Sequence, residues 1–78
     1  LAAVPGDPYF LELKGQILLE SGRPAEALGP LRAASEATRF EPLIAALLGH
    51  ALIATEDPAH FTEAEQVLRT AVARDRYN

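Results

Sequence analysis

The stretches LELKGQIL (residues 11–18) and AALLGHAL (residues 45–52) share one pattern: a central glycine, with an apolar residue four positions before it and another three positions after it. The two glycines lie 34 positions apart. Each stretch is followed by the pattern Ala-x-x-x-Leu-x-x-Ala, as ALGPLRAA (residues 27–34) and AEQVLRTA (residues 64–71). Self-similarity at such a period is typical of solenoid repeats, in which each repeat is one supersecondary unit. The sequence therefore predicts two copies of a helical hairpin.

The composition supports an all-α fold and argues against several classes of function. Of the 78 residues, 49% are hydrophobic, and many of these are alanine, the best helix former. There is no cysteine, so no disulfide and no thiolate metal site is expected. No apolar run approaches the ~18 residues that a membrane span needs. The net charge of −4 and the scattered basic residues argue against binding to nucleic acid.

Proline and glycine mark the expected helix boundaries. A proline stands at each expected helix start, where its missing N–H is not needed: Pro8, Pro24, Pro42 and Pro58. We expect four antiparallel helices, at residues 8–21, 24–38, 42–55 and 60–75. Gly22 is suited to end the first helix in the left-handed conformation. The start of the fourth helix stays open between Asp57, as an N-cap, and the capping box that begins at Thr62.

Gly15 and Gly49 fall in helix interiors, where glycine costs about 1 kcal/mol relative to alanine. Their equivalent positions predict a close helix approach that leaves no room for a Cβ, with Ala27 and Ala64 as the complementary small residues. Pro30 falls within the second helix, and we expect a local kink there. Tolerance of a proline at an exposed turn is the alternative.

The repeats divide the chain into three parts. Residues 1–7 read as the tail of a preceding repeat, residues 8–41 as the first full repeat and residues 42–78 as the second. The second repeat has three extra residues between its helices, where an insertion is well tolerated. We expect the chain to be a piece of a longer protein.

These residues resemble the tetratricopeptide repeat (TPR) family, which implies a right-handed stack of helical hairpins. The resemblance covers nearly the whole chain. It rests on these signature positions: Leu11, Gly15, Leu18, Ala27, Leu31 and Ala34 in the first repeat, and Ala45, Leu48, Gly49, Leu52, Ala64, Leu68 and Ala71 in the second. Lys14 and Ala45 depart from the large apolar residues that are usual there. The resemblance implies a non-catalytic module that binds protein, with no cofactor.

Residues 8–23 also resemble the TPR segment that follows the catalytic domain in certain bacterial zinc metalloproteases. Those proteins are typically periplasmic or envelope-associated, so this likeness implies the same location for the parent protein. The His-Glu-x-x-His motif of the protease is absent, and no catalytic residue is carried over. The implied role is a non-catalytic module that presents substrate to a protease domain or helps it assemble.

TPR proteins commonly bind an extended peptide or a helix in the groove lined by the first helix of each repeat. The resemblance places these residues in the groove: Tyr9, Glu12, Gln16, Leu19, Glu20, Leu43, Ala46, His50 and Ile53. The Lys/Asn/Arg clamp that some TPR domains use for a terminal carboxylate is missing. A hydrophobic or weakly basic segment is therefore the expected ligand. The alternative is that Glu12 and Glu20 are merely solvated.

The titratable residues do not form a pattern that predicts a metal or catalytic site. His50 and His60 are ten positions apart, on a helix and in the following loop, and lack the further ligands that zinc needs. No Ser/His/Asp set or cysteine nucleophile exists. Tyr9 and Phe10 could stack on a ligand, but we expect Phe10 to be a hydrophobic anchor of the first helix.

The end of the last helix suggests a second, structural role. Two repeats are fewer than the three or so that such stacks usually need, and no polar capping helix is evident. We expect Val67, Val72 and their neighbours to leave an apolar face exposed. A homodimer that buries this face, in a self-associating scaffold segment, is the alternative to peptide binding.

Overall fold

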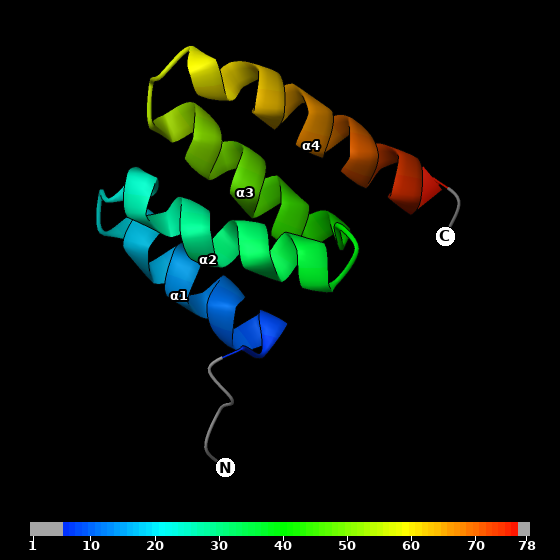
Figure 1. Ribbon diagram of the computed structural model, residues 1–78, viewed down its shortest axis with the longest axis horizontal. Helices are drawn as coiled ribbons and strands as arrows, with labels where there is room; N and C mark the ends of the chain where they lie inside the picture. The colour runs from blue at the N-terminus through cyan, green and yellow to red at the C-terminus, as the bar shows by residue number, and fades with distance from the viewer. Residues whose placement is uncertain (1–5, 77–78) are drawn as a thin grey trace.

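The chain forms a row of four α-helices, which the computed structural model describes over residues 6–76. They are α1 (Pro8–Glu20), α2 (Pro24–Ala37), α3 (Pro42–Ala54) and α4 (Ala59–Arg76). The helices follow one another in chain order and alternate in direction (Figure 1). The hairpins α1/α2 and α3/α4 contact each other mainly through α2 and α3. The all-α class is confirmed, and every predicted helix boundary lies within one residue of the observed one. Most of the predicted tail, residues 1–5, lies outside the described residues.

Acidic side chains begin three of the helices. The Asp7 carboxylate accepts hydrogen bonds from two first-turn amides of α1, and Glu41 does the same for α3. Asp57 accepts from the amide of Ala59 at 2.9 Å, so it begins α4. This decides between the two predicted starts, because Thr62 lies inside α4. A side-chain acceptor at this position satisfies amides that have no partner within the helix.

Residues in the left-handed backbone conformation follow the C-terminal ends of α1, α2 and α3. Gly22, at φ 76°, donates to the carbonyl of Leu19, while Arg23 donates to that of Leu18, which together form a Schellman motif. The backbone of the turn between α2 and α3 is strained, because two residues with a Cβ, Arg39 and Phe40, have positive φ values of 54° and 61°. Such values cost a residue with a Cβ roughly 1 kcal/mol or more.

Arg74 of α4 holds that strained turn in place. Its Nη1 donates to the carbonyl oxygen of Thr38 at 2.8 Å and to that of Arg39 at 3.2 Å. The end of the second hairpin is therefore tied to the junction of the two hairpins. This contact is between residues more than thirty positions apart, and it joins the hairpins by hydrogen bonds as well as by apolar packing.

The same glycine–leucine contact holds each hairpin together. A Cβ built on Gly15 would lie 2.5 Å from Cγ of Leu31, and one on Gly49 would lie 2.8 Å from Cδ2 of Leu68. The predicted close approach is thus present. The nearest atoms belong to these leucines, and Ala27 and Ala64, the predicted complementary small residues, are buried in the core.

The core is a thin layer of small and branched side chains between the helices. Its members come from α2, α3 and α4: Ala27, Leu28, Leu31, Ala45, Leu48, Ala51, Leu52, Ala64, Val67 and Ala71. Val67 was expected on an exposed face, but it is buried, because its side of α4 faces α3. Val72 is 66% exposed, as expected.

Pro30 lies within α2, which continues through it as one helix to Ala37. The side chain of Pro30 is half-buried. Gly29 precedes it, and the lack of a Cβ there relieves the clash that a proline imposes on the residue before it. None of the described helices is long and apolar enough to cross a lipid bilayer.

The glycine–leucine contact predicts an unequal response to the same substitution. In Gly15→Ala the new Cβ meets Leu31, which is fully buried and cannot swing aside. Overpacking of about 1–3 kcal/mol should exceed the ~1 kcal/mol gained in helix propensity, so the free energy of unfolding should fall. In Gly49→Ala the half-buried Leu68 can move toward solvent, and the loss should be smaller. Urea denaturation of the two variants measures the difference.

Leu68→Ala provides the control for this prediction. With the leucine truncated, Gly49→Ala should no longer clash and should stabilise the chain relative to Leu68→Ala alone. If Gly49→Ala has the same effect in both backgrounds, the leucine contact is not the reason for the glycine.

Candidate functional site

A furrow between α1 and α3 contains part of the predicted groove. These two helices have few contacts with each other, and a hollow of about 570 Å³ lies between them. It is lined by Gln16, Leu19, Glu20, Gly22, Pro24, Leu47, His50 and Ala54. Four of the nine predicted groove residues are among these, namely Gln16, Leu19, Glu20 and His50. We call this hollow the α1–α3 furrow.

The lining of the α1–α3 furrow is apolar with one negative charge. Leu19, Leu47 and Ala54 provide much of the apolar part, while Glu20 is the one charged group among the described residues that line it. Glu20 accepts a long hydrogen bond, 3.5 Å, from Nε2 of Gln16 on the previous turn. A furrow of this kind suits an apolar segment with a cationic group, and it offers no cation to a carboxylate.

The other five predicted groove residues lie elsewhere. Leu43 and Ala46 line a hollow on the far side of α3, against α4, and Ile53 lines another on that side with Phe61 of α4. Tyr9, which is 64% exposed, and Glu12 line neither the furrow nor these hollows. The structure thus places seven of the nine residues in hollows on the two sides of α3.

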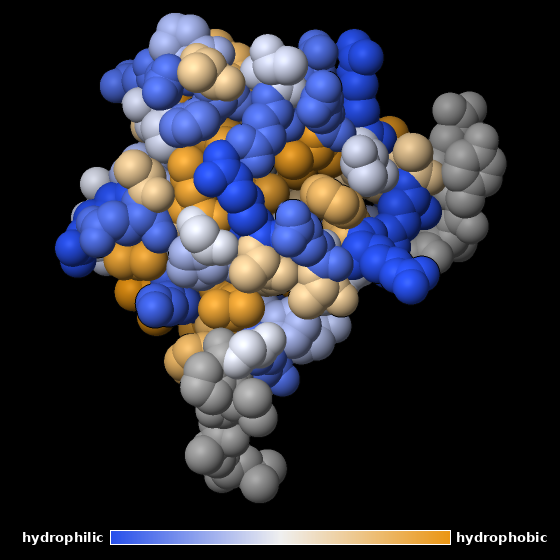
Figure 2. Space-filling model, in the orientation of Figure 1, coloured by the Kyte–Doolittle hydropathy of each residue, from blue (hydrophilic) through white to orange (hydrophobic). Residues whose placement is uncertain are grey.

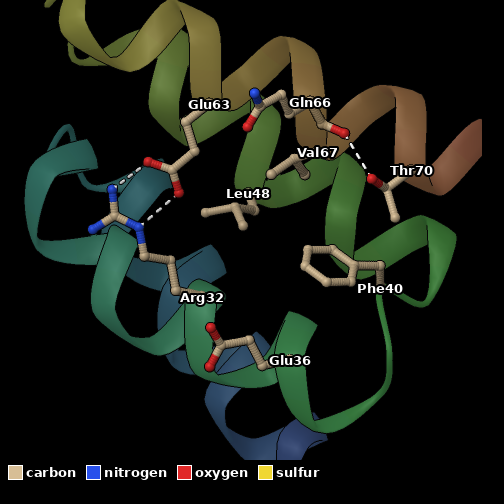
Figure 3. Close-up of a pocket in the computed structure, with 8 residues that line it drawn as sticks. All are labelled: Arg32, Glu36, Phe40, Leu48, Glu63, Gln66, Val67 and Thr70. Atoms are coloured by element: carbon tan, nitrogen blue, oxygen red, sulfur yellow. Dashed lines mark hydrogen bonds and ion pairs between the residues drawn. The ribbon is translucent and has the colours of Figure 1, made fainter.

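A further hollow, of about 260 Å³, lies between α2 and α4 and was not predicted. Arg32 of α2 reaches across it to Glu63 of α4, to one side of Leu48 and Val67 (Figure 3). Nε of Arg32 donates to one carboxylate oxygen at 2.9 Å, and Nη2 donates to the other at 2.6 Å. Figure 2 shows apolar surface between polar side chains across the middle of the face that it presents. The ion pair fastens the first hairpin to the second.

Each partner of this ion pair stabilises the charged form of the other. The hydrogen bonds from Arg32 lower the pKa of the Glu63 carboxyl, against the opposing effect of burial, and the charges of Arg32 and His60 lower it further. The hydrogen bond to Glu63 likewise raises the pKa of Arg32. Both side chains stay more than a third exposed, so solvent screening keeps the net stabilisation small.

The two histidines lie in different surroundings. His50 is exposed at the α1–α3 furrow. His60 was expected in a loop, but it lies in the first turn of α4, with Nδ1 2.7 Å from Oγ1 of Thr55. Within residues 6–76 no group of three or more His, Cys, Asp or Glu side chains is placed to hold a metal ion.

Comparison of the chain with protein-family models, with curated proteins and with solved structures gave no match.

The Arg32–Glu63 ion pair predicts a pH-dependent contribution to stability. Because the pKa of Glu63 is lowered by folding, its stabilisation is full above the ordinary glutamate pKa of about 4.5 and is lost as the pH falls through the lowered folded value. We expect Glu63→Gln to reduce the free energy of unfolding at pH 7 by about 0.2–1 kcal/mol, with no difference from the parent chain at strongly acidic pH. Urea denaturation across this pH range measures both.

Glu65→Gln is the matched control. Glu65 also lies on α4, but its oxygen is 3.6 Å from Arg69 and its side chain is more exposed. Its removal should have a smaller effect at every pH. A deficit in Glu63→Gln that persists unchanged into strong acid would contradict the assignment to the ionised carboxylate.

Proposed function

We propose that this chain is a non-catalytic, TPR-type protein-interaction module whose α1–α3 furrow binds an extended, largely apolar peptide segment with one basic residue. The observation that carries this proposal is the furrow itself. It separates the first helices of two equivalent hairpins, is lined mainly by apolar side chains and has Glu20 at its edge. Two hairpins with the same glycine–leucine contact support the TPR-type arrangement.

The chemistry of the furrow favours this ligand over an acidic one. Glu20 repels a carboxylate and attracts a lysine or arginine side chain, while Leu19 and Leu47 offer apolar surface to neighbouring residues. Exposed ion pairs contribute little affinity, so the apolar contacts provide most of the binding and the charge provides the preference. The ligand is then selected by its pattern of apolar residues around one cation.

The resemblance of residues 8–23 to a segment of bacterial zinc metalloproteases adds a setting to this proposal. In that setting the furrow presents a protein substrate to a protease domain of the same polypeptide, at the cell envelope. Sequencing the gene around this chain tests the setting. A His-Glu-x-x-His helix and a signal peptide upstream are expected, and further repeats without a protease domain would exclude it.

The proposed ligand can be tested with two labelled peptides that differ in one charge. Each has the same run of alanine, leucine and valine, with a central lysine in one and a central glutamate in the other. We expect the lysine peptide to bind more tightly, and Glu20→Lys to reverse this preference by about 3–5-fold, because an exposed ion pair is worth at most ~1 kcal/mol. Fluorescence polarisation measures the dissociation constants.

Glu36→Lys serves as the control, since it makes the same change in net charge on α2, at the hollow between α2 and α4. It should leave the preference unchanged. Equal effects of the two variants, or no binding of either peptide at millimolar protein, would rule out the furrow as the site.

A further inference from the structure

The structure aligns the two repeats residue by residue. Gly15 and Gly49 make the same contact with Leu31 and Leu68, so positions in the first helices correspond at an offset of 34. Positions in the second helices correspond at an offset of 37, because the second repeat has three extra residues, of which one lengthens the turn after α3 and two lengthen the start of α4. This alignment shows which positions are covered in one repeat and exposed in the other.

One apolar face is uncovered at the α1 end of the row. Phe10, Leu13 and Ile17 of α1 are between 40% and 54% exposed. Their equivalents in α3 are Ile44, Leu47 and Ala51, of which the first and last are fully buried and the second is half-buried. The helices differ because α3 packs between α2 and α4, whereas no described helix precedes α1. We call these three residues the α1 face.

The opposite face is uncovered at the α4 end, which Figure 1 shows at the other end of the row. Phe61 and Val72 are 46% and 66% exposed, and Leu68 is half-buried. The α2 equivalents of Leu68 and Val72 are Leu31 and Ser35, which are fully buried, since α3 packs on α2. We call Phe61, Leu68 and Val72 the α4 face.

The charges that join the two hairpins recur at the two ends. Arg32 of α2 binds Glu63 of α4, and the equivalents of these two residues are Arg69 on α4 and Glu26 on α2. Arg69 and Glu26 are both exposed, and within residues 6–75 Arg69 pairs with Glu65 and Glu26 pairs with Arg23, each in its own helix region. Such exposed local pairs are worth a few tenths of a kcal/mol and exchange easily.

We propose that a second copy of this chain packs head to tail on the first, with the α4 face of one copy on the α1 face of the next. This contact repeats the one between α2 and α3. It buries both apolar faces, and it brings Arg69 of one copy to Glu26 of the next in the way that Arg32 meets Glu63. Two more charges of opposite sign, Lys14 on α1 and Glu65 on α4, stand at positions whose equivalents, Leu48 and Leu28, are buried in the core. The contact would therefore take in both charges, and their opposite signs favour the pairing of unlike ends.

A contact of this type is heterologous, so it leaves one free face at each end of the pair. Association therefore does not stop at two copies but continues along the row. We expect the average mass of the chain in solution to rise steadily with concentration, beyond that of a dimer. This differs from a symmetric dimer of two α4 faces, whose mass would reach a plateau.

Two end-blocked variants test the proposal directly. Val72→Glu places a charge on the α4 face and Ile17→Glu places one on the α1 face, both at exposed positions where the hairpins should fold unchanged. Each variant alone should be monomeric, with association weakened about tenfold or more by the buried charge. An equimolar mixture should form a complex of one copy of each, because each still has the face that the other lacks. Sedimentation velocity measures the masses, and circular dichroism checks the fold.

Charge reversal tests the pairing of residues. Arg69→Glu and Glu26→Arg should each weaken self-association about 3–5-fold, and the double variant should recover it, since the contact is again between opposite charges. In the double variant, the glutamate at position 69 of one copy meets the arginine at position 26 of the next. Recovery is not expected from Glu26→Arg combined with Glu36→Arg, which leaves Arg69 facing a like charge.

Three results would overturn the proposal. One is a parent chain that stays monomeric at millimolar concentration. Another is dimerisation of Ile17→Glu alone, which would assign the contact to two α4 faces. The third is a mixture of the two blocked variants that remains monomeric. All of these are measured without peptide, so they do not depend on the proposed role of the α1–α3 furrow.

Discussion

The close approach of a leucine side chain to a bare glycine backbone sets the geometry of both hairpins. Leu31 lies on Gly15 and Leu68 lies on Gly49, with so little space that a methyl group would overlap the leucine. The second helix of each hairpin is therefore held at one distance and one rotation relative to the first. The three extra residues of the second repeat are accommodated in the turn after α3 and at the start of α4, and they leave this contact unchanged. Because the hairpins are alike, the surface that α2 offers to α3 has an equivalent on α4.

Local signals in the sequence predicted the helices, and long-range geometry decided the features that the sequence missed. Prolines at helix starts, Gly22 at the end of α1 and the apolar periodicity are local signals that depend on residues within about one helical turn. They therefore predicted each helix boundary to within one residue. The repeat identified the glycines as contact points, but it could not tell whether a leucine or an alanine fills the space. The burial of Val67 depends on the rotation of α4 against α3, which no local pattern specifies. The Arg32–Glu63 pair joins residues 31 positions apart. The sequence signals this pair only by a repetition: Arg32 recurs as Arg69 and Glu26 recurs as Glu63, each at the offset of 37 between α2 and α4.

The predicted groove was divided for a related reason. Residues of a middle helix face two neighbours, and α3 places His50 toward α1 while Leu43 and Ile53 lie on the side of α4. A first helix at the end of the row has only one such neighbour. A family resemblance indicates which positions along a helix are equivalent. The number of neighbouring helices decides which of those positions line the same cavity. Solenoid stability follows the same rule, since it is a sum of terms within repeats and between nearest neighbours.

Peptide recognition and self-association share residues in the proposed assembly. Leu19 and Pro24 line the α1–α3 furrow, and their equivalents in the second repeat are Ile53 and Phe61, which line a hollow that is open on one side. A following copy would close that hollow with its own α1, and Gln16 and Glu20 would then stand where His50 and Ala54 stand in the furrow. Each contact between copies would create a second furrow that has the same acidic residue on its wall. A ligand that binds this second furrow contacts both copies, so it strengthens their association, and association strengthens its binding by the same factor.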